Sequence, residues 1–202
     1  MAEFHDVTII TVHPGTHPQA LTVLEKSLPR DGLRACWYSE LGGLNQILII
    51  RRAENSDTAI GARLQQINTT NPFGIGELIA NMTMDTYVSL DIVGPMTAGE
   101  FGPFYEVRTY MLKPDGLPPT IQLWREAVPG RAKLSPLLAV MICATGPVTR
   151  FMHIWPYRSL DERGRIRAQA IAEGVWPPKG GAAHFVTQQT EIYLPAPFSP
   201  LR

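Results

Sequence analysis

The sequence predicts an α+β fold made of two tandem ferredoxin-like repeats, each with the order β-α-β-β-α-β, at about residues 1–98 and 99–202. Three observations favour this fold. The composition, with 45% hydrophobic and 18% charged residues, is typical of a packed globular protein, and the length of 202 residues fits one large domain or two small ones. Short sequence matches recur at long range along the chain, and both halves show the same succession of strand and helix patterns.

The internal repeat is carried by matches that keep their order along the chain. Three segments of the first half recur in the second: 4–7 as 104–107, 43–50 as 147–154, and 85–87 as 191–193. The offset grows from 100 to 104 to 106 residues, as small loop insertions would make it. A single match could arise by chance, but three in order favour a tandem duplication.

The first strand and first helix of each half follow from side-chain type and spacing. Residues 6–12 are rich in Val, Thr and Ile, and residues 104–112 are similar, so both segments are predicted to be strands. After a Pro/Gly turn, apolar side chains recur every three or four residues, which places them on one face of a helix. They are Leu21, Leu24 and Leu28 in the first half, and Leu117, Ile121, Trp124 and Val128 in the second.

The remaining elements of each half are a hairpin, a second helix and a closing strand. Two apolar runs around a Gly-containing turn predict each hairpin, at 34–41 with 45–51 and at 137–144 with 148–155. The second helix carries Ile60, Leu64 and Ile67 in one half and starts in the other at Ser159–Glu162, which has the form of a capping box. Strands at 82–88 and 185–194 complete the halves.

A β-α-β-β-α-β unit places both helices on one face of its four-stranded sheet and leaves the other face bare. Two such units in one chain can cover each other's bare faces. We therefore expect an intramolecular α+β barrel, a pseudo-dimer within one chain, with a cavity between the two sheets.

Charge and hydropathy exclude several classes of protein. The 18 basic residues balance the 18 acidic ones, which disfavours a nucleic-acid partner, and the basic group between Arg158 and Arg167 is interleaved with acidic residues. The longest apolar run, residues 137–144, is too short to span a membrane. The N-terminus resembles neither a secretory signal nor a mitochondrial presequence, so a cytoplasmic location is expected. The two cysteines, Cys36 and Cys143, are expected to be small hydrophobic side chains.

Two further motifs predict little chemistry. His13 and His17 have a spacing that serves metal ions on a helix, but Pro14 and Gly15 lie between them, so no metal site and no cofactor are expected. The segment 176–181, Trp-Pro-Pro-Lys-Gly-Gly, is predicted to be a connecting loop, with a lid over the cavity as the alternative.

The second half also carries a set of motifs specific in combination. They are Tyr-Glu-Val-Arg-Thr-Tyr at 105–110, Lys-Pro at 113–114, Gly-Pro-Val-Thr-Arg-Phe-Met-His-Ile-Trp-Pro-Tyr-Arg-Ser-Leu-Asp-Glu-Arg at 146–163, and Glu-Ile-Tyr-Leu-Pro-Ala-Pro-Phe at 191–198. In these segments the chain resembles the NIPSNAP family. The resemblance implies a dimeric α+β barrel fold. It carries over no settled activity, and Thr149 departs from the Asn that the family commonly has there.

Strand alternation groups the candidate site residues of the second half on one face. That face carries Glu106, Arg108 and Tyr110 from one strand and Phe151, His153 and Trp155 from the other. Because Met152 and Ile154 look suited to pack under helices, we expect the six to face the cavity between the sheets and to bind a small molecule. His153 is the candidate acid or base, Arg108 would hold an anionic oxygen, and Tyr110 would donate a hydrogen bond.

Other functions remain open at this stage. The same groups could form an internal cluster, Glu106 with Arg108 or Arg108 with His153, that joins the two halves without binding a ligand. The first-half counterparts, Asp6, Thr8, Ile10, Ile49 and Arg51, have mostly lost these side-chain types, so one pocket per chain is expected. Whether the chain is an enzyme is left open, as is further homodimerisation. The alternative function is a non-enzymatic scaffold or protein-interaction module.

Overall fold

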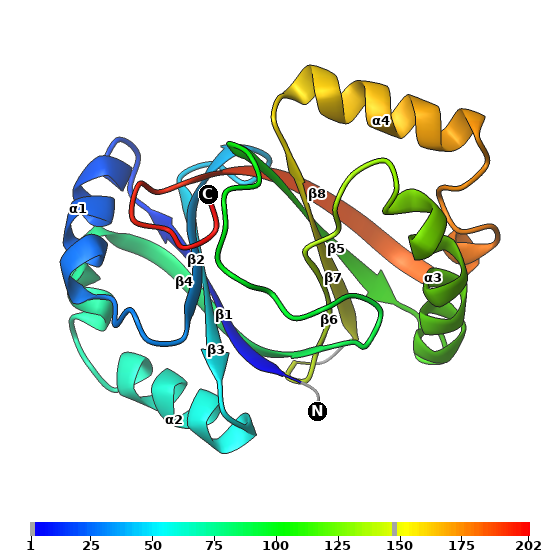
Figure 1. Ribbon diagram of the computed structural model, residues 1–202. Helices are drawn as coiled ribbons and strands as arrows, with labels where there is room; N and C mark the ends of the chain where they lie inside the picture. Colours follow the sequence, from blue (N-terminus) through cyan, green and yellow to red (C-terminus); the bar gives the residue numbers. More distant parts are fainter. Residues whose placement is uncertain (1–2, 147–148) are drawn as a thin grey trace.

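The computed structural model describes residues 3–146 and 149–202 and contains the predicted elements in the predicted order (Figure 1). In the first half these are β1 (Phe4–Val12), α1 (His17–Ser27), β2 (Leu33–Leu41), β3 (Gln46–Ala53), α2 (Ser56–Ile67) and β4 (Ile79–Ser89). In the second they are β5 (Phe104–Leu112), α3 (Leu117–Arg131), β6 (Ala139–Cys143), β7 (Arg150–Tyr157), α4 (Leu160–Ala172) and β8 (Phe185–Pro195). Short 3₁₀ helices lie at Pro72–Gly74, Gly76–Leu78 and Gly181–His184. Val148, where a strand was predicted to start, lies outside the described residues.

The strands form one closed antiparallel barrel in the order β1-β3-β2-β8-β5-β7-β6-β4. Each half contributes the order of a ferredoxin-like sheet, β4-β1-β3-β2 and β8-β5-β7-β6. The two sheets join at both edges, where β2 pairs with β8 and β4 pairs with β6. The predicted fold class is confirmed, and the predicted division at 98/99 falls in the segment between β4 and β5.

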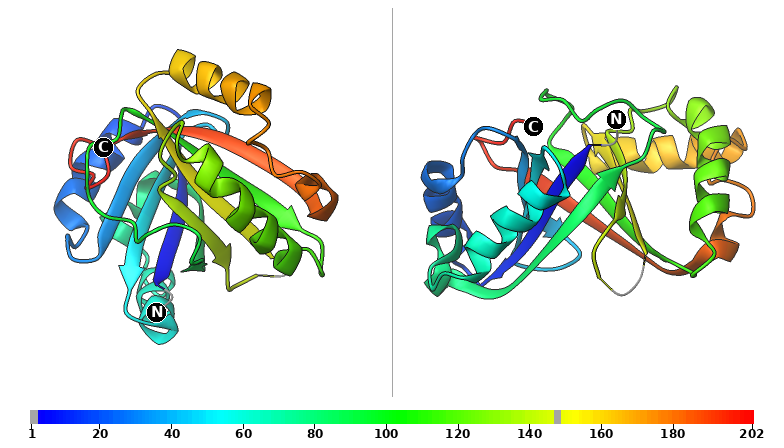
Figure 2. Two further views of the ribbon diagram at one scale, coloured as in Figure 1. Left: turned by 45° about the vertical axis from the view of Figure 1, so that its right-hand side comes forward. Right: turned by 90° about the horizontal axis from the view of Figure 1, so that it is seen from below.

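The helices lie outside the barrel, with those of the two halves on opposite sides (Figure 2). Polar side chains at their N-termini explain where two of them begin. The Asn55 side chain accepts a hydrogen bond of 2.9 Å from the Thr58 N–H at α2, and the Ser159 hydroxyl accepts one of 3.0 Å from the Glu162 N–H at α4. The capping motif predicted at Ser159 is therefore present. Within the described residues, no helix has both the length and the apolar character needed to cross a membrane.

The barrel interior is a packed core built by both halves. Trp37 of β2 stacks on Tyr105 of β5 with ring centroids 4.2 Å apart. Buried residues around them include Val7, Leu48, Tyr87, Val107, Met141, Met152, Ile154 and Tyr193. The Trp37 indole N–H also donates to the Leu201 carbonyl at 2.9 Å, which fixes the C-terminal segment against the barrel. Side chains fill the interior of an eight-stranded barrel of this kind.

The predicted grouping of side chains is present, but the predicted orientation of the two strand faces is wrong. Met152 and Ile154 point into the barrel, whereas Phe151 and Trp155 pack in the core on the helix side of the second-half sheet. Alternation determines which residues share a face, but it does not determine which face points inward when both are apolar. The candidate site residues therefore lie between the sheet and helices α3 and α4, outside the space between the two sheets.

Candidate functional site

The register of β5 and β7 brings the six predicted site residues side by side on the helix face. Glu106 is opposite Trp155, Arg108 is opposite His153, and Tyr110 is opposite Phe151. Directly opposed residues on one face of an antiparallel pair have their side chains in contact range. On this face, β5 therefore presents a carboxylate, a guanidinium and a phenol in succession, and β7 presents an indole, an imidazole and a phenyl ring opposite them.

His153 lies at the centre of an aromatic cluster. Its ring centroid is 4.5 Å from that of Trp124 on α3 and 4.9 Å from that of Tyr110. The Trp155 indole N–H donates a 2.6 Å hydrogen bond to Nδ1 of His153. Phe151 packs edge to face against Trp124, with ring centroids 4.7 Å apart. The imidazole is thereby held in one orientation by its neighbours.

The same contacts define the protonation of His153. Burial lowers its pKa well below the usual value, and the positive charges of Arg108, Arg167 and Arg131 lower it further. The imidazole is therefore neutral at pH 7. Because an indole N–H can only donate, Nδ1 is the acceptor and the ring proton sits on Nε2. This Nε2–H is buried without a hydrogen-bond partner among the described residues.

Glu106 is fully buried at the centre of a group of arginines from β5 and α4. Its Oε1 accepts a 2.6 Å hydrogen bond from Arg163 and lies 3.8 Å from nitrogen atoms of both Arg108 and Arg167. The Tyr157 hydroxyl lies 3.4 Å from the other carboxylate oxygen. One buried carboxylate thus serves three guanidinium groups.

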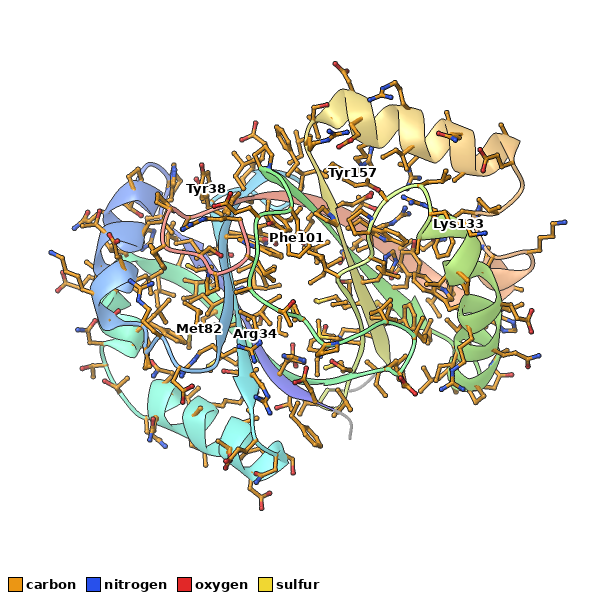
Figure 3. All side chains as sticks on the ribbon, in the orientation of Figure 1. Arg34, Tyr38, Met82, Phe101, Lys133 and Tyr157 are labelled. Atoms are coloured by element: carbon orange, nitrogen blue, oxygen red, sulfur yellow. The ribbon has the colours of Figure 1, made fainter. Side chains whose placement is uncertain are left out.

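A fourth guanidinium lies behind this cluster. Arg131, at the end of α3, donates to the Ser135 hydroxyl at 2.7 Å and to the Tyr157 hydroxyl at 3.2 Å, and it lies 4.3 Å from the ring centroid of Trp155. Tyr157 is the last residue of β7 and lies near the start of α4 (Figure 3). All these groups belong to the second half, so the cluster does not join the two halves as the alternative interpretation of Glu106 and Arg108 required.

A cavity of about 530 Å³ opens beside the aromatic cluster. It is lined by Tyr110, Trp124, Ile171, Gly174, Trp176, Pro177, Pro178, Lys179, Gly180, Gly181, Ala182, Phe185 and Gln188. The loop 176–181 forms one wall, and its Trp176 packs on Trp124 of α3 with ring centroids 4.8 Å apart. On the sheet side, Tyr110 packs on Phe185 with ring centroids also 4.8 Å apart. Of the six predicted residues, Tyr110 lines this cavity, and His153 lies behind Tyr110 and Trp124.

The first half does not reproduce this arrangement. Thr8 and Ile49 are paired at the positions that correspond to Arg108 and His153, and Asp6 is paired with Arg51. Asp6 is buried, and burial raises its pKa to about 6 in spite of the opposing charges of Arg51 and Arg63. The aromatic and cationic groups are therefore concentrated in the second half.

Several residues of the site were not predicted. They are Arg131, Arg163, Arg167 and Phe185, whereas Trp176 was predicted only as part of the segment 176–181, a connecting loop or a lid over the cavity between the sheets. Arg163 and Arg167 had a usable signal, because residues four apart on a helix share one face and that face had to cover the sheet. The alternation of acidic and basic residues between Arg158 and Arg167 obscured it. Trp176 and Phe185 enter the site through a loop and a strand end, for which the sequence carries no periodic signal.

Comparisons with known proteins show which sequences and which folds this chain resembles. The NIPSNAP family model matches residues 105–200. A curated NipSnap homolog of Dictyostelium discoideum is 26% identical over 145 residues, which cover 69% of this chain and 63% of that protein. The chain therefore spans less than two thirds of the length of that relative.

Two solved structures show the fold of the whole chain. A candidate monooxygenase from Fusobacterium nucleatum has a TM-score of 0.67 at 9% identity, covering 96% of this chain and 92% of its own. A candidate monooxygenase from Lactobacillus acidophilus has a TM-score of 0.63 at 10% identity, covering 96% of this chain and 94% of its own. Both cover the two halves together. The family model matches residues 105–200, which contain the motifs quoted above, so the second half of this chain is similar to the NIPSNAP family.

Proposed function

We propose that this protein binds a small molecule with an aromatic ring in the cavity between the second-half sheet, α3 and the loop 176–181. One observation carries the proposal: a cavity of about 530 Å³ whose walls are formed largely by aromatic rings and apolar loop residues. Ligand sites in proteins are typically concave, largely apolar and of this size, with a few polar groups nearby. Aromatic walls favour a flat, unsaturated ligand, because rings stack or meet edge to face.

The chemistry available at this cavity favours binding over proton abstraction. A general base near neutral pH needs a free nitrogen lone pair, but Nδ1 of His153 already accepts from Trp155 and Nε2 carries the proton. Tyr110 and the guanidinium of Arg108 are likewise donors at pH 7. The monooxygenase descriptions belong to fold neighbours of 9–10% identity, which say nothing about the activity of this chain.

The alternative, a protein-interaction module, is favoured by a different feature. Ile60, Leu64 and Ile67 of α2 are about half exposed, although their spacing predicts one apolar helix face. Substituting Leu64 by Ser tests that alternative separately, because α2 lies in the half without the cavity. Loss of a copurifying protein partner in Leu64→Ser, with small-molecule binding intact, would favour the interaction module.

The proposal is tested by filling the cavity. A Cβ at Gly181 would make ordinary contacts, 3.6 Å from Pro178 and 3.9 Å from Phe185, so Gly181→Leu places a side chain in the cavity with little strain at the backbone. Gly164 on α4 has no neighbouring atom within 4 Å of such a Cβ, so Gly164→Leu is the matched control. The probe is 2-naphthamide, an uncharged bicyclic aromatic, titrated by calorimetry into the full-length protein.

We expect the unsubstituted protein and Gly164→Leu to bind 2-naphthamide and Gly181→Leu to lose that binding while keeping its thermal unfolding midpoint. Equal binding by all three proteins would place the aromatic site elsewhere. Absence of binding in all three would contradict the proposed function.

A further inference from the structure

We infer that the ligand of this cavity carries an oxyanion, a carboxylate or a phosphate ester, which the guanidinium groups of Arg108 and Arg167 recognise. The inference deepens the proposed function and rests on it. It gives the ligand class: an aromatic acid, whose ring occupies the cavity and whose anionic group points toward α4.

The first reason is an imbalance of charge. Arg108, Arg163 and Arg167 all lie within 4 Å of a single carboxylate, Glu106, so three positive charges share one negative charge. Arg131 adds a further positive charge behind them. Repulsion between partly buried cations is unfavourable unless anions nearby compensate it, and an oxyanion on the ligand would supply such a counter-charge.

The second reason is unused hydrogen-bonding capacity. Arg163 donates to Glu106 at 2.6 Å, but Arg108 and Arg167 approach it only to 3.8 Å, which is too long for a hydrogen bond. Neither of these two guanidinium groups makes a side-chain hydrogen bond within residues 3–146 and 149–202. The Nε–H of Arg108 is also buried and unpartnered there. A guanidinium is a rigid fork of donors that matches the two oxygens of a carboxylate or phosphate.

The third reason is that Arg108 and Arg167, although they do not line the aromatic cavity themselves, each lie next to a residue that does. Arg108 lies 5.3 Å from the ring centroid of Tyr110, which lines the cavity. Arg167 precedes Ile171, another lining residue, by one turn of α4, a rise of about 6 Å. The guanidinium groups remain reachable from solvent, since the side chains of Arg108 and Arg167 are 14% and 35% exposed.

The position of these arginines relative to Tyr110 and Ile171 also limits the size of the ligand. A ring in contact with Tyr110 and an anionic group one helical turn away fit a molecule whose carboxyl or phosphate group is attached directly to the ring system. In the first half, the position that corresponds to Arg108 is occupied by Thr8, which carries no positive charge. The first half therefore does not combine an aromatic cavity wall with a guanidinium group at this position.

The experiment compares three probes of the same ring: 2-naphthoate, 2-naphthyl phosphate and the neutral 2-naphthamide. Calorimetry is carried out on the full-length protein, on Arg167→Gln, and on Arg165→Gln. Arg165 is exposed on the same helix, and within the part of the chain that the structure describes it forms no ion pair with Glu106, so it is the matched control for loss of one positive charge.

We expect at least one of the anionic probes to bind more tightly than 2-naphthamide by roughly tenfold to a hundredfold, the usual value of a charge-assisted hydrogen bond. Arg167→Gln should remove most of that preference and leave 2-naphthamide binding unchanged, whereas Arg165→Gln should keep the preference. Whichever anion binds more tightly identifies the oxyanion as carboxylate or phosphate ester.

Two results would overturn the inference. Equal affinity for all three probes would leave the aromatic site in place and remove its anion specificity. A preference for the anions that survives in Arg167→Gln, or disappears equally in Arg165→Gln, would mean that general electrostatic attraction and not this guanidinium pair is responsible. Failure of all three probes to bind would instead contradict the proposed function itself.

Discussion

Replacing Glu106 by Gln tests whether its carboxylate holds the arginine cluster together. The substitution keeps the shape of the side chain and removes its charge, so Arg108, Arg163 and Arg167 lose their shared counter-charge. Breaking a fully buried ion pair from one side costs about 3–5 kcal/mol. Because Arg163 and Arg167 are 27% and 35% exposed, water screens part of the repulsion, and we expect a loss of about 2–3 kcal/mol in the free energy of unfolding.

The measurement is urea denaturation of the full-length protein, with the change in midpoint converted to free energy at a constant slope. The double variant Glu106→Gln/Arg163→Gln should recover part of the loss, because it removes the guanidinium that hydrogen-bonds the carboxylate. Phosphate in the buffer should stabilise Glu106→Gln more than the unsubstituted protein. A Glu106→Gln variant as stable as the unsubstituted protein would refute the assignment of Glu106 as the counter-charge of this cluster.

Three further predictions concern stability and assembly. Burial, with the nearby charges of Arg34 and Arg52, lowers the pKa of His5 in the folded protein to about 4, whereas in the unfolded chain it is near 6.5. Because the unfolded chain binds a proton first as the pH falls, the free energy of unfolding should decrease by about 3 kcal/mol between pH 6.5 and 4. His5→Gln should flatten that part of the stability profile, and an unchanged slope would contradict the shift. Burial raises the pKa of Asp6 to about 6, so the unfolded state loses this proton first and stability is lost as pH rises from 3.8 to 6. Asp6→Asn should therefore be more stable at pH 7, by up to about 3 kcal/mol, and urea denaturation at pH 4 and 7 checks this. Residues 99–202 expressed alone expose the edges of β6 and β8 that pair with β4 and β2, so they should dimerise or aggregate, and a stable monomer by light scattering would count against the intrachain pseudo-dimer.

The order of elements could be predicted because local patterns carry it. Alternation in 104–112, the three- and four-residue spacing from Leu117 to Val128 and the cap at Ser159 each depend on neighbouring residues alone. The recurrence of these patterns in both halves then indicated a barrel, because two sheets with one bare face each can satisfy one another.

The orientation of the site could not be predicted from the same patterns. Met152 and Ile154 are as suitable for a barrel interior as for an interface with helices. The same is true of Phe151 and Trp155, which alternate with them along β7. The choice depends on partners far away in sequence: Trp37 and Tyr105 already fill the barrel, while Trp124 of α3 offers an aromatic surface to Phe151 and His153.

The arginine cluster shows a second limit of sequence analysis. The carboxylate at Glu106 and the guanidinium at Arg108 were predicted to share a face, and they do. Arg163 and Arg167 reach the same carboxylate from α4, which packs on the face of the sheet that carries Glu106, and this packing brings the charges together.

The location of the ligand site is tested most directly by a crystal structure of the full-length protein with 2-naphthoate. We predict the naphthalene ring in the cavity against Tyr110 and Trp124, with the carboxylate within hydrogen-bonding distance of Arg108 or Arg167. A ring bound inside the barrel, between residues such as Trp37 and Tyr105, or on the first-half helices would contradict a site on the helix side of the second-half sheet.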